Sequence, residues 1–426
     1  MTSRRVVVTG VGVVAPNAHG CDDFTAALRK GITGIRFHQH LADGNFACQV
    51  GGIPEGLEAK RSHYLTPEEV ATTNTNMVYA SIAAVDAWID AGLRRPEPDA
   101  DEVDWEAGAL IGTGIGGMDT IAERLVPMTN AGKVSRMGSA VVEQIMSSGN
   151  SARVAGLLAL GNQVSTPSSA CNTGTEAIIE AFFRIRESRA ERMLAGGSEG
   201  CSKYIWAGFD AMKVLNRTSN AAPERASRPM SASAAGFVPA AGAGILLLES
   251  LESAERRGAH IYAEVLYGYL TCGGHRMGGS MTAPNPHGVR RCIRGAIAGA
   301  GIRPEEIDLI NGHLTATFAD PLEIDNWASA LELAPARMPW LQSTKSLIGH
   351  SLGAAGGIEC AASVLQLARG FVHGSVNCSD VHPKLLPYSR RIARETFDAP
   401  DLRVVAKASF GFGDVNGCVV FSKFPR

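Results

Sequence analysis

The sequence lacks several features that would place it in a special class of proteins. No stretch approaches the roughly 20 consecutive apolar residues that a membrane-spanning helix needs. The apolar start at residues 6–14 is short and broken by glycine, unlike the hydrophobic part of a signal peptide. Basic and acidic residues nearly balance, 40 against 42, so neither nucleic acid nor a charged membrane surface is indicated as a partner. We therefore expect a soluble globular protein.

The nine cysteines contain no CxxC pair and no regular spacing. An odd, scattered set predicts reduced thiols and a cytoplasmic location rather than a disulfide framework. His38 and His40 are closely spaced, but nothing nearby completes a set of metal ligands, so we predict no metal site.

Runs rich in Val, Ile and Leu alternate with helical patterns along the 426 residues, which predicts an α/β fold. The length allows two domains or one large duplicated unit. The helical patterns are clearest at 77–91 and 289–300. The clearest strands are predicted at 5–14, 109–112, 245–249, 261–266, 309–311, 404–408 and 419–421.

Two pairs of segments repeat in the same order. A helix that ends in glycine and proline precedes an acidic linker and the strand at 109, and the same pattern precedes the strand at 309. Glycine-rich turns also lead into hydrophobic strands in 236–248 and 410–421. We interpret these matches as a duplication, with an N-terminal half at 1–255 and a C-terminal half at 256–426.

Cys171 interrupts a run of small residues, and a helical pattern begins at the next turn. At a helix N-terminus, free N–H groups and the helix dipole stabilise a thiolate, which can attack acyl groups. Nearby backbone N–H groups could then hold an oxyanion. A small buried cysteine that caps a helix explains this motif alone equally well.

The C-terminal half offers partners for such a thiol. His313 follows the predicted strand 309–311, and Lys345 and His350 lie in a loop before a helix of small residues. Its glycines predict close packing and burial, and a buried lysine needs a counter-charge, which Glu359 could supply. A lone histidine in a loop is usually structural, but strand ends bracketed by glycine are where active sites of sheet proteins gather.

These motifs, taken in order over the whole chain, resemble the elongating β-ketoacyl-acyl-carrier-protein synthases, which are condensing enzymes of the thiolase superfamily. Ser169-Ala-Cys171 resembles the nucleophile motif, and Asn311-Gly-His313 the first histidine motif. Residues 344–350 resemble the motif of a lysine and a second histidine, and 409–413 with Asn416 the gating loop. The resemblance implies a duplicated, five-layered αβαβα thiolase-like fold and a dimer in which N-terminal halves join their sheets edge to edge.

The resemblance implies a decarboxylative Claisen condensation, in which Cys171 takes an acyl group from a carrier protein and a malonyl thioester then loses carbon dioxide. His313 and His350 would donate N–H groups to the enolate oxygen. The backbone N–H groups of Cys171 and Phe410 would face the thioester on Cys171. Lys345 would act electrostatically while paired with Glu359.

The resemblance also implies which residues form the gate of the site and which bind the substrate. Phe410, Gly411 and Phe412 would form the gate, and no cofactor is implied beyond the phosphopantetheine arm of the carrier. Thr315 and Thr317 resemble residues that hold this arm. Ile115 and Phe209 match positions that line the acyl pocket, although an ordinary core position explains them nearly as well.

This chain departs from the family pattern in three respects. Leu314 and Ala316 replace a small and a hydroxyl residue beside His313, and a charge network is missing at Ala234, Ala235 and Ala241. The usual basic docking helix is acidic and neutral at 66–73, so docking of the acidic carrier would use other residues, namely Lys133, Arg136 and Lys213. These departures point toward specialised polyketide or polyene synthesis as well as fatty acid synthesis.

Two other functions remain open. A non-decarboxylating acyl-CoA thiolase would need a second catalytic cysteine, and Cys418 is the cysteine nearest the C-terminal loop. A non-catalytic chain-length partner of a ketosynthase would lack the nucleophile, whereas Cys171 is present. The protein could itself pair with such a partner instead of forming a homodimer.

Overall fold

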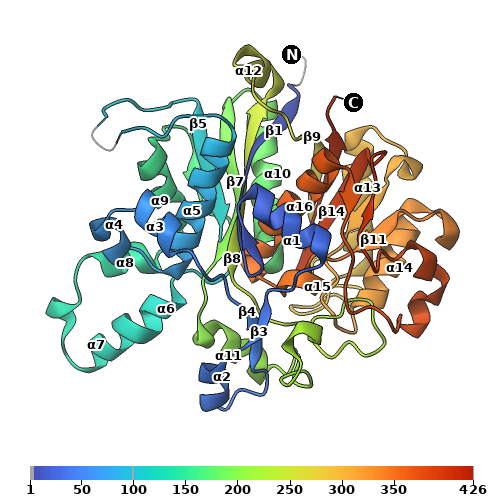
Figure 1. The fold of residues 1–426 in the computed structure, drawn as a ribbon, viewed down its shortest axis with the longest axis horizontal. Helices are drawn as coiled ribbons and strands as arrows, with labels where there is room; N and C mark the ends of the chain where they lie inside the picture. The colour runs from blue at the N-terminus through green and yellow to red at the C-terminus, as the bar shows by residue number, and fades with distance from the viewer. Residues whose placement is uncertain (1–3, 98–99, 426) are drawn as a thin grey trace.

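The computed structural model describes residues 4–97 and 100–425 and shows two half-sheets that meet side by side (Figure 1). The strand order is β6-β5-β7-β8-β1-β9-β15-β14-β10-β11, with β2 beside β1. The N-terminal half contributes β1 (Val6–Ala15), β2 (Ala18–His19), β5 (Ala107–Gly112), β6 (Val164–Ser165), β7 (Arg192–Glu199) and β8 (Gly242–Ser250). The C-terminal half contributes β9 (Ala263–Cys272), β10 (Leu309–Asn311), β11 (Trp340–Gln342), β14 (Val404–Gly411) and β15 (Val415–Lys423).

The two halves repeat one topology about the β1–β9 junction. In the first half, β5 pairs in parallel with β6 and β7, and β8 pairs antiparallel with β7 and β1. In the second half, β10 pairs in parallel with β11 and β14, and β15 pairs antiparallel with β14 and β9. The repeated sequence segments thus occupy equivalent strands, β5 with β10 and β8 with β15. The predicted boundary at 255 falls in α12 (Leu251–Arg256), just before β9.

Helices form three layers around the half-sheets (Figure 1). The helices α10 (Thr173–Arg186) and α16 (Ala355–Arg369) contact each other and strands of both half-sheets. On the outer faces, α5 (Thr75–Asp90) and α9 (Gly149–Leu158) cover the first half-sheet, and α13 (Pro286–Ala300) with α14 (Asp320–Leu331) covers the second. This arrangement is the five-layered α/β fold that the resemblance implied.

The outer and central helices differ in sequence because they differ in burial. In α13, Val289, Ile293 and Ile297 recur at helical spacing and face the sheet, while Asn285 caps its first turn and Gly301 ends it in a left-handed conformation. In α16, by contrast, every residue from Ala355 to Leu367 is buried. A helix that is covered on all sides needs small residues where two backbones meet.

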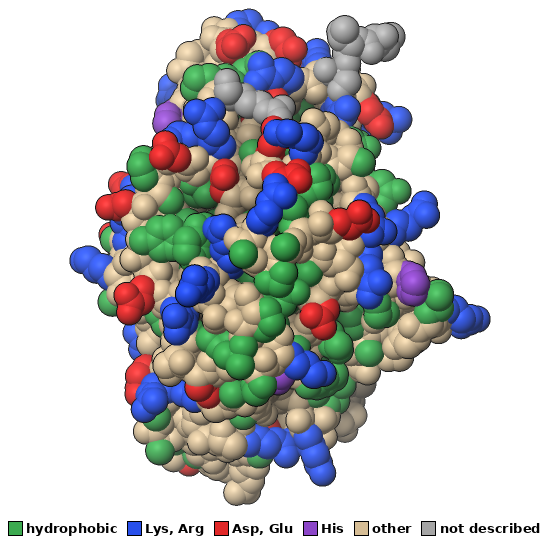
Figure 2. All heavy atoms as spheres, turned by 90° about the vertical axis from the view of Figure 1, so that its right-hand side faces the viewer, with side chains coloured by type: hydrophobic (Ala, Val, Ile, Leu, Met, Phe, Trp, Pro, Cys, Tyr) green, Lys and Arg blue, Asp and Glu red, His purple; other side chains and the backbone are tan. Residues whose placement is uncertain are grey.

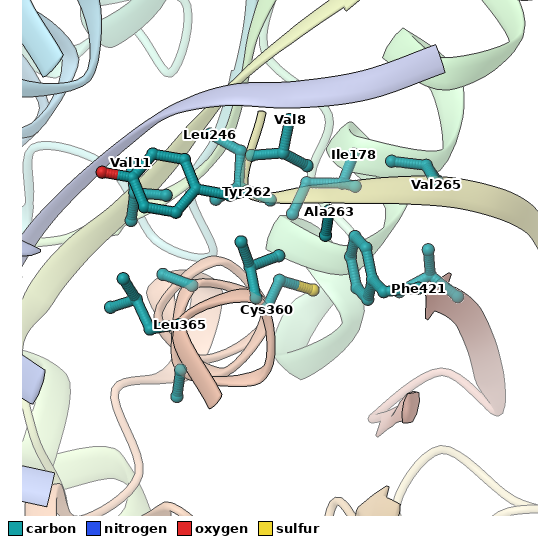
Figure 3. Packing of buried hydrophobic residues seen from close by; sticks show 14 of the residues in the cluster. Val8, Val11, Ile178, Leu246, Tyr262, Ala263, Val265, Cys360, Leu365 and Phe421 are labelled. Atoms are coloured by element: carbon teal, nitrogen blue, oxygen red, sulfur yellow. The ribbon is translucent and has the colours of Figure 1, made fainter. Parts of the chain in front are cut away.

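The central core lies between the half-sheets around these two helices. Figure 3 shows Val8 and Leu246 from the first half, Val265 and Phe421 from the second, and Ile178 of α10 packed together. Burying this apolar surface stabilises both halves at once, since each half supplies part of the other's covering.

The remaining elements are short and surround the layers. Small two-stranded antiparallel sheets are formed by β3 (Ile35–Phe37) with β4 (Val50–Gly52) and by β12 (Phe371–Val372) with β13 (Phe397–Asp398). The other α-helices are α1 (Cys21–Lys30), α2 (Gln39–Asp43), α3 (Glu58–Tyr64), α4 (Pro67–Ala71), α6 (Met118–Thr120), α7 (Val126–Asn130), α8 (Ala140–Ile145), α11 (Lys203–Ala211) and α15 (Lys345–Ile348). Within 4–97 and 100–425, no helix combines the length and apolar character that crossing a bilayer requires.

Most of the predicted strands and helices are present, and the ends of the strands are set by the strands with which they pair. The strand at 309–311 has the predicted bounds, and β9 runs on to Cys272 because it pairs with β15 along its length. The strand β7 was not among the predicted strands, because its two glycines and lack of β-branched residues give a weak strand signal. Its neighbours β5 and β8 fix it as a strand from both sides.

We expect Gly357→Ala to lower the free energy of unfolding by about 3 kcal/mol, because overpacking against rigid backbone is not relieved by a rotamer change. A Cβ at Gly357 would lie 2.1 Å from the carbonyl oxygen of Gly244 and 2.8 Å from the amide nitrogen of Gly197. Chemical denaturation of the full chain measures the change. Gly208→Ala in α11 is the matched control, since no atom lies within 4 Å of its Cβ position. Equal midpoints for the two variants would contradict this reading of the central layer.

Candidate active site

Cys171 lies at the start of the central helix α10. It is in a single 3-10 turn, Ala170–Asn172, that leads directly into Thr173. Ala170 has a φ of 51°, a left-handed conformation that costs a non-glycine residue about 1–2 kcal/mol. The Thr173 hydroxyl accepts a hydrogen bond from the Ser169 amide at 2.8 Å and so holds the turn in place. The predicted position at a helix N-terminus is therefore confirmed.

His350 meets this thiol from the loop before α16. Its Nε2 lies 3.1 Å from Cys171 Sγ, and its Nδ1 accepts the backbone N–H of Leu352 at 3.3 Å. Because Nδ1 accepts, a neutral ring carries its proton on Nε2, which then points at the sulfur. The loop thus presents an N–H donor to the reacting centre.

His313 completes the group from the end of β10. Its backbone N–H and that of Leu314 donate to the Glu323 carboxylate, each at 2.7 Å, which fixes the turn after the strand. The His313 ring lies 5.3 Å from the His350 ring, and one nitrogen or sulfur atom from each of Cys171, His313 and His350 lies within 4.8 Å of the others. The structure therefore brings these three predicted residues around one small volume.

A buried cluster of charges lies behind the histidines. The Lys345 ammonium pairs with Oε1 of Glu359, as the sequence suggested. Lys407, which sequence analysis did not select, lies 2.7 Å from Oε2 of the same carboxylate. The exposed fraction of each of the three side chains is at most 1%, so two ammonium groups share one carboxylate away from water.

The pKa values of the histidines follow from this setting. Burial first, and then the nearby positive charges of Lys345 and Lys407, lower the pKa of His350 well below its usual value. The pKa of His313 falls well below its usual value for the same reasons, with His350 adding to the effect. Both rings are therefore neutral at pH 7, which is the form that donates a hydrogen bond without giving up a proton.

The Cys171 thiol differs from the expectation based on its position at a helix N-terminus alone. Burial raises the pKa of the Cys171 thiol to about 11, although the Lys345 charge and a backbone N–H of Phe412 act in the opposite direction. The resting group is thus a thiol and not the predicted thiolate, because loss of hydration outweighs the favourable charges.

The gating loop corrects one predicted donor. The backbone hydrogen bond to the Cys171 sulfur comes from Phe412, not from Phe410. Phe410 is still within β14 and pairs with Asn416 of β15, whereas Phe412 follows the last strand residue, Gly411, and is free to turn toward the sulfur. The Phe410 ring instead lies 6.3 Å from the His313 ring.

The predicted pocket residues lie next to this gate. The Phe209 ring is 6.3 Å from the Phe412 ring and 5.5 Å from Phe237, whose ring is 5.2 Å from His350. Ile115 belongs to the same apolar cluster as Phe209, and its backbone N–H donates to Glu199 at 3.2 Å. This apolar group is continuous with the site, and its role in holding an acyl chain stays a prediction.

The residues expected to hold the phosphopantetheine arm are partly exposed beyond His313. The Thr315 and Thr317 hydroxyls are 3.0 Å apart, and the Thr315 amide donates to Asp320 at 2.9 Å. Between them, Ala316 is left-handed with a φ of 62°, and its carbonyl accepts the Gly236 amide at 3.0 Å. Leu314 is buried in the core of the C-terminal half.

The three alanines at the positions of the missing charge network are held by other contacts. Ala234 and Ala235 directly follow a turn that Asp380 holds by accepting hydrogen bonds from the Ser231 hydroxyl and the Ser233 amide. Ala241 is fully buried in the core of the N-terminal half. The replacement residues therefore fit an apolar setting at one position and a tethered turn at the others.

The basic residues expected to dock a carrier, Lys133, Arg136 and Lys213, are all exposed. Lys213 follows α11, the helix that carries Phe209 near the gate. On the face formed by the C-terminal half, Lys and Arg side chains alternate with Asp and Glu (Figure 2). Docking through these three residues stays a prediction.

Three charged residues around the site, Glu199, Lys407 and Asp414, were not among the predicted residues. Glu199, at the end of β7, accepts hydrogen bonds from the amides of Gly114 and Gly353 at 2.9 and 3.0 Å. It thereby connects the loop that carries Ile115 to the loop after His350. Asp414 accepts the amides of His275 and Asn285 at 3.1 and 2.8 Å and anchors the gating loop. Of the three, Lys407 had a signal in the sequence, because it is a charged residue within an otherwise hydrophobic strand.

We expect alkylation of Cys171 by iodoacetamide to rise about tenfold per pH unit from about pH 7 to about pH 9, since only the thiolate reacts and the pKa of the thiol is about 11. Peptide mass spectrometry separates this site from the exposed Cys272. Cys171→Ala is the control for assignment. A rate at Cys171 that does not change with pH would show a resting thiolate and contradict the expected state.

Comparisons with known proteins agree with this geometry. Residues 3–254 match the family "Beta-ketoacyl synthase, N-terminal domain", and residues 262–379 match "Beta-ketoacyl synthase, C-terminal domain". A relative from Rhizobium meliloti, 3-oxoacyl-[acyl-carrier-protein] synthase 2, is 34% identical over 99% of each chain.

Two solved structures are similar over nearly the whole chain. The ishigamide ketosynthase/chain length factor has a TM-score of 0.88 and 29% identity, and covers 99% of this chain and 100% of that one. A type II ketosynthase in complex with its acyl-carrier protein, AntDE:AntF, has a TM-score of 0.86 and 28% identity over 99% of each chain. The thiolase-like fold and the family expected from the motifs are thus confirmed, and the chain belongs to the β-ketoacyl synthase family of condensing acyltransferases.

Proposed function

We propose that this protein elongates an acyl chain held on Cys171 with a malonyl unit delivered by an acyl carrier protein. The observation that carries the proposal is the convergence of one thiol and two neutral imidazoles within 4.8 Å. Such a site combines a nucleophile for acyl groups with two N–H donors for an enolate oxygen.

In the first half-reaction, Cys171 Sγ attacks the carbonyl carbon of an acyl thioester on the carrier. The new S–C bond forms as the bond to the carrier sulfur breaks, and the thiol proton passes to the departing carrier thiolate. The backbone N–H groups of Cys171 and Phe412 stabilise the intermediate oxyanion. The thiol form of Cys171 at rest means that this proton must leave as the substrate arrives.

In the second half-reaction, a malonyl thioester loses carbon dioxide, and the electrons of the broken C–C bond form an enolate. Nε2–H of His350 and the ring of His313 stabilise its oxygen. The enolate carbon attacks the thioester on Cys171, a C–C bond forms, and the Cys171 sulfur leaves and regains a proton. A neutral imidazole suits this step, because an imidazolium would protonate the enolate and yield an acetyl thioester instead.

The alternatives fit the site less well. Cys418 is fully buried in the core of the C-terminal half, and burial, followed by interaction with Cys292, raises the pKa of its thiol well above the usual value. This setting disfavours a thiolase, which would need a second catalytic cysteine. A silent chain-length partner would not need the complete set of Cys171, His313 and His350.

The proposal also includes a protein partner and its docking residues. We propose an acyl carrier protein as the substrate donor, docked through Lys133, Arg136 and Lys213, with Thr315 and Thr317 along its phosphopantetheine arm and no other cofactor. The similar AntDE:AntF structure contains an acyl-carrier protein, which supports this choice.

The proposal extends to the pathway and the assembly. The substitutions at Leu314, Ala316, Ala234, Ala235 and Ala241 favour specialised polyketide or polyene elongation over housekeeping fatty acid synthesis. We propose a dimer, formed either by two copies or with a homologous chain-length factor, since a ketosynthase/chain length factor is among the similar structures. We also propose a cytoplasmic location, which the scattered, free cysteines support.

We expect labelled malonyl carrier protein to release carbon dioxide with the wild-type enzyme, and His313→Ala to slow this release by about 10²–10³-fold, since one donor to the oxyanion is lost. Acylation of Cys171 in the same variant should stay close to wild type, as read by mass spectrometry. If His313→Ala slowed carbon dioxide release and acylation of Cys171 equally, the role given to His313 would be wrong. If the wild-type enzyme released no carbon dioxide, the thiolase alternative would be favoured.

The Cys171 variants separate the two half-reactions. Cys171→Ala should abolish acyl loading, because no other group replaces the sulfur. Cys171→Gln should abolish condensation but retain carbon dioxide release, since both histidine donors remain. Persistence of acyl loading in Cys171→Ala would show that the nucleophile lies elsewhere.

A further inference from the structure

Glu199 is a fully buried carboxylate at the last residue of β7, and neither half-reaction uses it. Its Oε1 accepts hydrogen bonds from the Thr113 hydroxyl at 3.0 Å and from the Ile115 amide at 3.2 Å. Its Oε2 accepts the amides of Gly114 and Gly353 at 2.9 and 3.0 Å. Four donors thus surround one buried group, which compensates for the cost of removing a carboxylate from water.

The direction of the bond from Thr113 follows from its other partners. Its hydroxyl oxygen accepts hydrogen bonds from the Asn76 side-chain amide at 3.0 Å and from the Gly116 backbone amide at 3.1 Å. Both lone pairs are then occupied, so the hydroxyl proton points at Glu199. All four neighbours therefore donate, and an ionised carboxylate matches them. Burial raises the pKa of Glu199, and these four hydrogen bonds oppose that rise.

The four donors belong to two loops that pack backbone against backbone. Gly114 lies in the loop after β5, and Gly353 lies in the 3-10 turn Leu352–Ala354 that follows the second histidine. A Cβ at Gly353 would lie 2.4 Å from the Gly114 amide nitrogen and 2.7 Å from Oε2 of Glu199. Neither loop can therefore shift without disturbing the carboxylate that both share.

Leu352 connects the acyl pocket to the imidazole. Its side chain is buried in the same apolar cluster as Ile115, while its amide donates to His350 Nδ1 at 3.3 Å. Its φ is 49°, a left-handed conformation that a leucine keeps only when surrounding contacts hold it. Glu199 supplies one of these contacts, because it accepts the next amide along the chain, that of Gly353.

We propose that Glu199 is a positioning residue that couples the acyl pocket to His350. Its carboxylate holds the loop of Ile115 and the turn of Leu352 as one unit, so that an acyl chain in the pocket also orders the N–H donor for the enolate. This proposal rests on the proposed function. It adds that recognition of the acyl chain and loss of carbon dioxide are linked through one buried carboxylate.

The primary test measures hydrogen exchange of backbone amides by mass spectrometry after alkylation of Cys171. The two probes are N-hexyl iodoacetamide, which places an alkyl chain at the site, and iodoacetamide, which does not. In the wild type, we expect the hexyl chain to slow exchange by about tenfold in both 113–116 and 351–354. In Glu199→Gln only 113–116 should respond, because the amide of glutamine cannot accept from all four donors.

The second test compares Glu199→Gln with Thr113→Val, which removes one donor on the pocket side and keeps the bond to Gly353. Carbon dioxide release from malonyl carrier protein by octanoyl-loaded enzyme should fall by about tenfold in Glu199→Gln, since the amide that holds His350 is loosened. In Thr113→Val it should stay within about twofold of wild type.

Acyl selectivity should change in both variants, since both loosen the pocket loop. The ratio of kcat/KM for octanoyl and butanoyl carrier protein should move toward one by about threefold. Glu199 also raises the pKa of the Cys171 thiol through its charge, and the ratio cancels this effect because it is common to both substrates.

Glu249→Gln is the matched control, because Glu249 is a fully buried carboxylate of β8 that pairs with Arg257. It should lower the thermal midpoint and leave the exchange response, carbon dioxide release and selectivity unchanged.

Three results would overturn the proposal. The first is a response of 351–354 to the hexyl chain in Glu199→Gln that equals the wild-type response. The second is the same loss of response in Glu249→Gln, and the third is failure of both Glu199→Gln and Thr113→Val to fold, since each would show a role in the fold alone. Absence of carbon dioxide release by the wild type would refute the proposed function instead. The exchange measurement would still test Glu199, because it requires only alkylation of Cys171.

Discussion

The close contact of two helix backbones in the central layer sets the geometry of this protein. A Cβ at Gly174 of α10 would lie 2.5 Å from the amide of Gly357 in α16, and one at Gly197 would lie 2.1 Å from the carbonyl of Gly353. Glycine is therefore required where the two halves meet. Because α10 begins just after Cys171 and α16 just after His350, this contact brings the thiol and the imidazole to 3.1 Å.

Burial at this junction then decides the chemistry. Loss of hydration keeps Cys171 as a thiol and the two histidines neutral, and these states suit the two steps of the proposed condensation, acyl transfer to the sulfur and stabilisation of the enolate. The charges needed to sustain this setting are themselves buried, as the Lys345, Glu359 and Lys407 cluster.

Much of the site could be predicted from the sequence because its residues lie in local motifs. Cys171 before a helix, His313 after a strand, and Lys345 with His350 before a glycine-rich helix each have a short-range signature. Glu359 could be inferred because a buried lysine needs a counter-charge. Phe410 was chosen over Phe412 as a backbone donor, because a sequence does not show at which residue a strand ends and its amides become free.

The sequence by itself determined the α/β class, the duplication, the family and the identity of the reacting groups, since periodicity, caps and short motifs are encoded within a few residues of each other. Tertiary structure decided which protonation states these groups adopt and which distant residues join them. Lys407, Glu199 and Asp414 are separated from their partners by long stretches of chain, and their roles arise only when folding removes water and places one carboxylate or amide within reach. Burial and charge pairing are properties of the assembled core, so no local pattern can specify them.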